Sequence, residues 1–128
     1  MPGMRPTLDD LGQFLMTRLR DSAFEKADLT IQGHWGAPSL RRLQGDLAEL
    51  DDHQRDVARR LVRYVIDSAI HDILFALKEQ SELDGSVRLV VDGVDAATLS
   101  VDGLHGEAFG PDGWQARFSR YGEAPEDA

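Results

Sequence analysis

Three side chains on one predicted helix carry the groups that proton transfer or nucleophilic catalysis requires. Ser68, His71 and Asp72 supply a hydroxyl, an imidazole and a carboxylate, and spacings of three and four residues place them on one helix face. A nucleophilic triad draws its members from separate elements and adds donors for the oxyanion. A single helix holds these groups on parallel vectors, which argues against acyl transfer.

The adjacent pair His71-Asp72 also matches the metal-binding core of the HD phosphohydrolases. Those enzymes need further helical His and Asp ligands, whereas the chain after Leu83 is predicted to form strands. His53 lies eighteen residues before His71, about 27 Å away along a continuous helix, so the two cannot share one metal. The sequence therefore predicts no metal site and no cofactor.

Asp72 is the most informative member of this group. A helical wheel places it between Leu61 and Val65 in an apolar stripe, so we expect a partly buried carboxylate. Such a group suits acid-base chemistry, but pairing with Arg117 or Arg120 would make it structural. Both roles stay open.

The loop pair His34-Trp35 lies between two glycines. A tryptophan there can line a pocket or anchor a partner, because interface hot spots are enriched in Trp. It can equally close the edge of a small core. The candidate functional cluster comprises Ser68, His71, Asp72, Trp35 and His34.

Other charged patterns are interpreted as structural. Asp92, Asp95 and Asp102 lack the spacing and terminal Glu of an EF-hand loop and are predicted to be turn residues. The arginines over 55–63 can be neutralised by acids at four-residue spacing, which leaves no basic patch for nucleic acid. The sequence contains no Gly-rich phosphate loop, GxSxG elbow or HExxH motif.

The elements that position these residues are helical in the first half. Leucines at helical spacing predict a helix over 8–27, with Thr7 as its N-cap. Glycines and a proline predict a loop over 32–38, and Ser39 starts a short amphipathic segment. Asp51-Asp52 then precede a long helix over 53–82.

The long helix carries two apolar regions. In its first half an apolar stripe lies opposite a row of arginines and predicts one buried face; the stripe comprises Val57, Leu61, Tyr64 and Val65. In its second half apolar residues occupy other sides of the helix, at Ile66, Ile70, Ile73, Leu74 and Leu77. A helix that is apolar on most sides is buried on more than one, so we expect a central helix or a homodimer interface.

Four Asp-Gly pairs punctuate the second half, at Asp84, Asp92, Asp102 and Asp112. Asp-Gly between alternating apolar runs is a strong hairpin signal, and strands are predicted near 86–91, 97–102, 105–109 and 113–120. The predicted fold is α+β: N-terminal helices with one long central helix, packed on a C-terminal antiparallel meander of three to four strands. We expect a single domain over 1–121 and a disordered acidic tail over 122–128.

Composition limits the classes of function. The 128 residues suit one core, and the net charge of −9 disfavours nucleic acid and favours either basic partners or simple solubility. The chain has no cysteine, hence no disulfide, thiolate zinc site or cysteine nucleophile. No membrane span or signal peptide is recognisable, so we expect a cytoplasmic protein.

Several short segments carry a family resemblance: VDGLHGE (101–107), GW (113–114), FSRY (118–121) and HDIL (71–74). They resemble the C-terminal end of a family of small bacterial proteins of unknown function. The resemblance implies a compact bacterial cytoplasmic domain and carries over no activity.

The preferred expectation is a non-catalytic, acidic protein-interaction domain of the immunity or accessory type. It would bind a protein partner or a second copy of itself, and neither nucleic acid nor membrane. The alternative is a small hydrolase or ligand-binding domain that uses a cleft between helix and sheet around Asp72, with His71 and Trp35.

Overall fold

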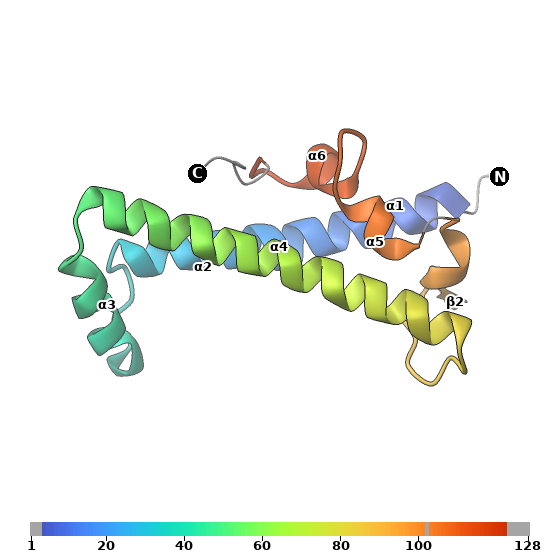
Figure 1. The fold of residues 1–128 in the computed structure, drawn as a ribbon, viewed down its shortest axis with the longest axis horizontal. Coiled ribbons are helices and arrows are strands. Elements are labelled where there is room, and N and C mark those ends of the chain that lie inside the picture. Colours follow the sequence, from blue (N-terminus) through green and yellow to red (C-terminus); the bar gives the residue numbers. More distant parts are fainter. Residues whose placement is uncertain (1–3, 102, 123–128) are drawn as a thin grey trace.

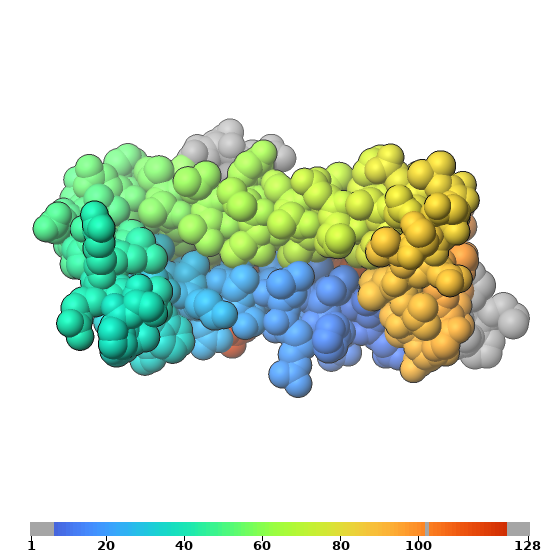
Figure 2. All heavy atoms as spheres, turned by 90° about the horizontal axis from the view of Figure 1, so that it is seen from below, coloured from blue at the N-terminus to red at the C-terminus, as the bar shows by residue number. Residues whose placement is uncertain are grey.

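Two long antiparallel helical segments form the frame of the molecule. The computed structural model describes residues 4–101 and 103–122, with side chains from Thr7 onward. The first segment is a continuous helical run of α1 (Met4–Leu15), the π-helical η1 (Met16–Asp21) and α2 (Ser22–Ile31). The second segment is α4 (Asp52–Glu82), which runs antiparallel to the first (Figure 1). The two segments lie side by side along the molecule (Figures 1 and 2).

The helix ends follow from local capping. Asp51 caps α4 in a capping box, in which its side chain accepts from the Gln54 N–H at 2.8 Å and the Gln54 side chain accepts from the Asp51 N–H at 2.9 Å. The predicted helix over 53–82 is therefore confirmed almost to the residue. The first helix is longer than predicted: it begins at Met4, so Thr7 lies inside it and is not the N-cap.

At one end of the frame, a loop and two short helices connect α2 to α4. The loop over 34–37 leads into η2 (Pro38–Leu40) and α3 (Arg41–Ala48). Figure 1 shows α3 projecting away from the long helices at this end. The predicted loop and the short amphipathic segment are both present.

The C-terminal half is not a meander. Its only sheet within the described residues pairs β1 (Val90–Val91) with β2 (Val94–Asp95) in antiparallel register. Three short helices follow: η3 (Ala96–Leu99), α5 (Leu104–Ala108) and α6 (Trp114–Phe118). The predicted α+β fold with three to four strands is wrong, because the chain is mostly helical.

The Asp-Gly pairs mark breaks between elements, but the elements between these breaks are mostly short helices and not the predicted strands. Asp92-Gly93 forms the predicted hairpin turn, with φ of 51° and 80°. Gly103 and Gly113, by contrast, precede the five-residue helices α5 and α6. Trp114 and Phe118, two positions of the predicted alternating strand, are also four apart, so a segment this short fits one turn of helix equally well.

The main core lies where the second half of α4 meets α1, η3, α5 and α6. It comprises Leu8, Leu11, Met16, Ile70, Leu74, Ala96, Leu104, Ala108 and Trp114. Ile70 and Leu74 of the second apolar region of α4 are buried in this core, but Ile73 of the same region is 54% exposed, so the expectation that α4 is buried on most sides there is wrong.

The predicted buried face in the first half of α4 is wrong. Val57, Leu61, Tyr64 and Val65 are 43%, 60%, 66% and 52% exposed. The arginine side turns inward instead, because Arg59 and Arg63 both pair with Asp28 of α2 at 3.1 Å. Arg59 and Arg63 thus face α2, while Ile70 and Leu74 face the core, and the apolar stripe of α4 is left facing solvent.

The molecule carries no membrane-spanning candidate in the part of the chain that the structure describes: none of these helices is long and apolar enough. The single-domain boundaries stay a prediction. The predicted disordered tail over 122–128 falls, apart from Gly122, outside the described residues.

Candidate functional site

An apolar face of α4 is left open to solvent. We define the outer stripe as Val57, Leu61, Tyr64, Val65 and Phe75, which are between 38% and 66% exposed. Positions 57, 61, 64, 68, 71 and 75 alternate in steps of four and three, the spacing of a helix face that pairs with another helix. The part of this face from Val57 to Val65 is open to solvent, whereas His105 of α5 packs on His71 and Phe75 at its other end.

The middle of the outer stripe is interrupted by a hollow that carboxylate, hydroxyl and imidazole groups share with aromatic rings. Ser68, His71 and Asp72 line it together with Tyr64, Asp67 and Phe109, and its volume is about 270 Å³. Phe109 comes from the segment after α5, so the hollow lies between α4 and the C-terminal helices. We call it the Asp72 hollow. Three members of the predicted cluster therefore do share one surface site.

Asp72 itself is exposed. Its side chain is 79% accessible, and its one polar contact among the described residues is with Nδ1 of His71 at 3.2 Å. The expected partial burial is wrong, since the stripe that carries Asp72 faces solvent. Neither expected arginine partner reaches it: Arg117 pairs with Asp9 at 2.9 Å, and Arg120 pairs with Glu25.

The imidazole of His71 is fixed by aromatic packing. It stacks on Phe75 at 6.2 Å between ring centroids and meets His105 of α5 edge-on at 5.3 Å. No three His, Asp or Glu side chains gather as metal ligands within the described residues. Aromatic rings beside carboxylates are instead suited to recognising an organic cation, such as a lysine or arginine side chain.

His34 and Trp35 lie apart from the Asp72 hollow. The Trp35 N–H donates to the Gln44 side chain at 3.0 Å, whose amide donates back to the Trp35 carbonyl at 2.8 Å, and the indole donates to Thr30 at 3.0 Å. Trp35 thus fastens α3 to α2, while His34 packs edge-on against its ring. Trp35 lies on the α3 side of the ion pair between Asp28 and Arg63. Asp72 lies on the other side of this pair, about 14 Å farther along the axis of α4 than Arg63.

A buried arginine that the sequence analysis missed fixes the wall of the hollow. Arg20 is fully buried in η1 and binds Asp67 of α4 through Nε at 2.7 Å and Nη2 at 3.0 Å. Its other N–H groups donate to Ser119 Oγ at 2.8 Å and to the carbonyls of Tyr121 and Gly122 at 2.6 and 2.9 Å. All five guanidinium donors are used.

Arg20 neutralises Asp67 and leaves Asp72 as the hollow's other carboxylate, whose one polar partner within the described part of the chain is the neighbouring His71. The partners of Arg20 are 47 or more positions away, so no local pattern could reveal them. Four-residue spacing would pair Asp67 with Arg63, but Arg63 is held by Asp28. The π-helical turns of η1 bury both Arg20 and Asp21, an irregularity that often marks a constrained site.

Comparison with known proteins gives no relative: no protein-family profile, no curated protein and no solved structure matches this chain. A functional assignment has to come from the geometry of the chain itself.

Asp72→Asn is expected to change the free energy of unfolding by less than about 0.5 kcal/mol, because the carboxylate is exposed and forms a single contact. Urea denaturation of the variant and the parent protein measures this difference. A loss of more than about 1.5 kcal/mol would show that Asp72 is a structural carboxylate after all.

Proposed function

We propose that the protein is a small acidic interaction domain that binds a basic, amphipathic helical segment of another protein along the outer stripe. The observation that carries the proposal is the solvent exposure of an apolar helix face with heptad spacing, beside a hollow that contains free negative charge. Apolar residues of the partner would cover Leu61 and its neighbours. A lysine or arginine would enter the Asp72 hollow.

Helix-in-groove recognition supports this geometry. An amphipathic helix anchors itself through residues spaced three and four apart, which is the spacing of the outer stripe. Tyr64 is the most exposed member of the stripe and borders the hollow. Aromatic residues of this kind supply much of the binding energy in interfaces.

Charge favours a basic partner over a second copy of the chain. Asp72 and Glu79 lie seven residues apart on the face of the outer stripe, so two copies paired here would bring carboxylates together. The whole chain carries a net charge of −9, of which residues 79–128 contribute −8 (3 basic and 11 acidic groups). That field attracts a cationic segment and opposes self-association.

The cleft on which the hydrolase alternative depended is not present in the described part of the chain. That alternative relied on a cleft between helix and sheet around Asp72, whereas the sheet within the described residues is limited to β1 and β2. The walls of the Asp72 hollow come from α4 and the segment after α5. Cation recognition is the chemistry that this set of residues supports best.

The test uses a synthetic amphipathic helix of leucine and lysine, with a leucine and glutamate peptide of the same pattern as its charge control. Leu61→Asp is expected to weaken binding of the lysine peptide at least about tenfold, because it places a charge in the apolar contact. Ile73→Asp is the matched control: Ile73 is also on α4 and is 54% exposed, but lies outside the stripe. Calorimetric titration gives the affinities.

The substitution separates docking from simple charge attraction. If the lysine peptide were held only by the acidic surface, the added carboxylate of Leu61→Asp would strengthen its binding. That result, or equal losses in Leu61→Asp and Ile73→Asp, would contradict the proposal. A dimer in sedimentation experiments that Leu61→Asp dissociates would instead assign the stripe to a second copy.

A further inference from the structure

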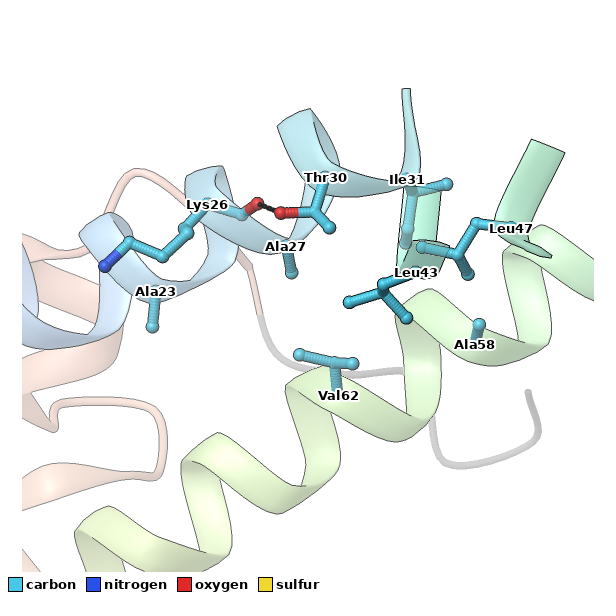
Figure 3. A pocket seen from close by; sticks show the side chains of 9 residues that line it. All are labelled: Ala23, Lys26, Ala27, Thr30, Ile31, Leu43, Leu47, Ala58 and Val62. Carbon is cyan, nitrogen blue, oxygen red and sulfur yellow. Dashed lines mark hydrogen bonds between the residues drawn. The ribbon is translucent and has the colours of Figure 1, made fainter. Parts of the chain in front are cut away.

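A second, different hollow lies at the α3 end of the frame. Between α2, α3 and α4 runs an apolar groove of about 370 Å³, within the range of small-molecule sites. We call it the α2–α4 groove; its lining comprises Ala23, Lys26, Ala27, Thr30, Ile31, Leu43, Leu47, Ala58 and Val62. Figure 3 shows the alanines of α2 facing Val62 and Leu43 across the open space.

The shape of the groove follows from small residues at a helix crossing. Ala23 and Ala27 on α2 and Ala58 on α4 present only methyl groups, so their side chains leave the space between the two helices unfilled. Leu43, on the α3 side, is 50% exposed. An apolar groove of this volume suits a hydrocarbon chain better than a helix.

The polar groups of the lining leave one free charge. The Thr30 hydroxyl is occupied, since it donates to the Lys26 carbonyl at 2.7 Å and accepts from the Trp35 indole at 3.0 Å. The neighbouring acids of α2 are taken by other cations: Glu25 by Arg120, and Asp28 by Arg59 and Arg63. Lys26 has no ion pair among the described residues, and Figure 3 shows its ammonium at the Ala23 end of the groove.

We infer that the α2–α4 groove binds a medium-chain carboxylate, with the carboxylate at Lys26 and the hydrocarbon chain directed toward Ile31, Leu43 and Leu47. At one end of the lining is the exposed ammonium of Lys26, which has no ion pair in the described part of the chain, and at the other end are apolar side chains. This polarity matches an amphipathic anion and excludes a cationic amphiphile. The inference is independent of the outer stripe.

Octanoate, below its micelle-forming concentration, is the probe. Calorimetry is expected to give saturable binding of one octanoate per chain, with a shift of the Trp35 indole N–H signal in NMR, because Trp35 is bonded to Thr30 in the groove wall. Lys26→Gln is expected to weaken octanoate about three- to fivefold, the scale of a partly exposed ion pair, and to leave octan-1-ol unaffected. Arg42→Gln, on α3 outside the lining, is the control.

Ala27→Leu fills the groove and is expected to weaken octanoate and octan-1-ol alike, by at least about tenfold. Ala58→Leu does the same from the α4 wall and replaces it if Ala27→Leu does not fold. Unchanged affinity in the filled variants, or equal binding of octyltrimethylammonium, would overturn the inference. So would a dimer of the parent protein that Ala27→Leu dissociates, because the groove would then hold a second copy.

Discussion

Arg20→Ala is expected to lower the free energy of unfolding by about 3–5 kcal/mol, because it removes one partner of a buried ion pair and leaves the other uncompensated. Asp67 would lose both of its guanidinium bonds, which measure 2.7 and 3.0 Å. Ser119 and two carbonyl groups would also lose their donor. Denaturant unfolding followed by circular dichroism measures the loss.

Two controls show whether the guanidinium network is responsible. Arg60→Ala removes an exposed helix pair with Asp56 and is expected to cost less than about 1 kcal/mol. Arg20→Met combined with Asp67→Leu is expected to be more stable than Arg20→Met alone, since the second change removes the stranded carboxylate. If Arg20→Ala cost no more than Arg60→Ala, the buried network would not hold the C-terminal segment in place.

Trp114→Ala is expected to cost about 3–5 kcal/mol, the range for deleting a buried aromatic side chain. Trp114 is fully buried against α1, and a methyl group added at Gly12 would lie 2.4 Å from its indole ring. Trp114→Phe is expected to be much milder, because the indole Nε1 has no acceptor among the described residues. Thermal and urea unfolding compare the variants.

The same contact reverses the usual effect of a helical glycine. Alanine normally stabilises a helix interior by about 1 kcal/mol relative to glycine, but Gly12→Ala is expected to destabilise by about 1–3 kcal/mol because it overpacks the indole. Gly45→Ala is the matched control: Gly45 lies in α3 with no atom near its missing Cβ, so there the usual gain is expected. Stabilisation of both variants would contradict the close packing of α1 on α6.

The long helices could be predicted because their signals are repeated many times. Asp51 caps the start of α4, and the helix then continues for 31 residues without proline or glycine. The Asp-Gly pairs locate the turns. The five-residue helices of the C-terminal half could not be separated from strands, because i, i+2 and i, i+4 spacings coincide in so short a segment. The rotation of α4 could not be predicted either, since the contacts that distinguish its inner face are distant in sequence: those of Asp28 with Arg59 and Arg63 span 31 and 35 positions.

The candidate site was predicted in part for the same reasons. Ser68, His71 and Asp72 share a hollow because helical spacing alone brings them together. Trp35 and His34 lie apart from this hollow, since they belong to the loop that connects α2 to α3. Exposure of Asp72, and neutralisation of Asp67 by Arg20, depend on tertiary contacts that no local pattern records.

Backbone NMR of the labelled protein, titrated with the leucine and lysine helix, tests most directly whether the outer stripe is the binding surface. The predicted result is a set of shifts that follows Leu61, Val65, Ser68 and Asp72 along α4 and is absent in Leu61→Asp. Shifts confined to the acidic segment over 79–122, or spread evenly over the surface, would contradict it.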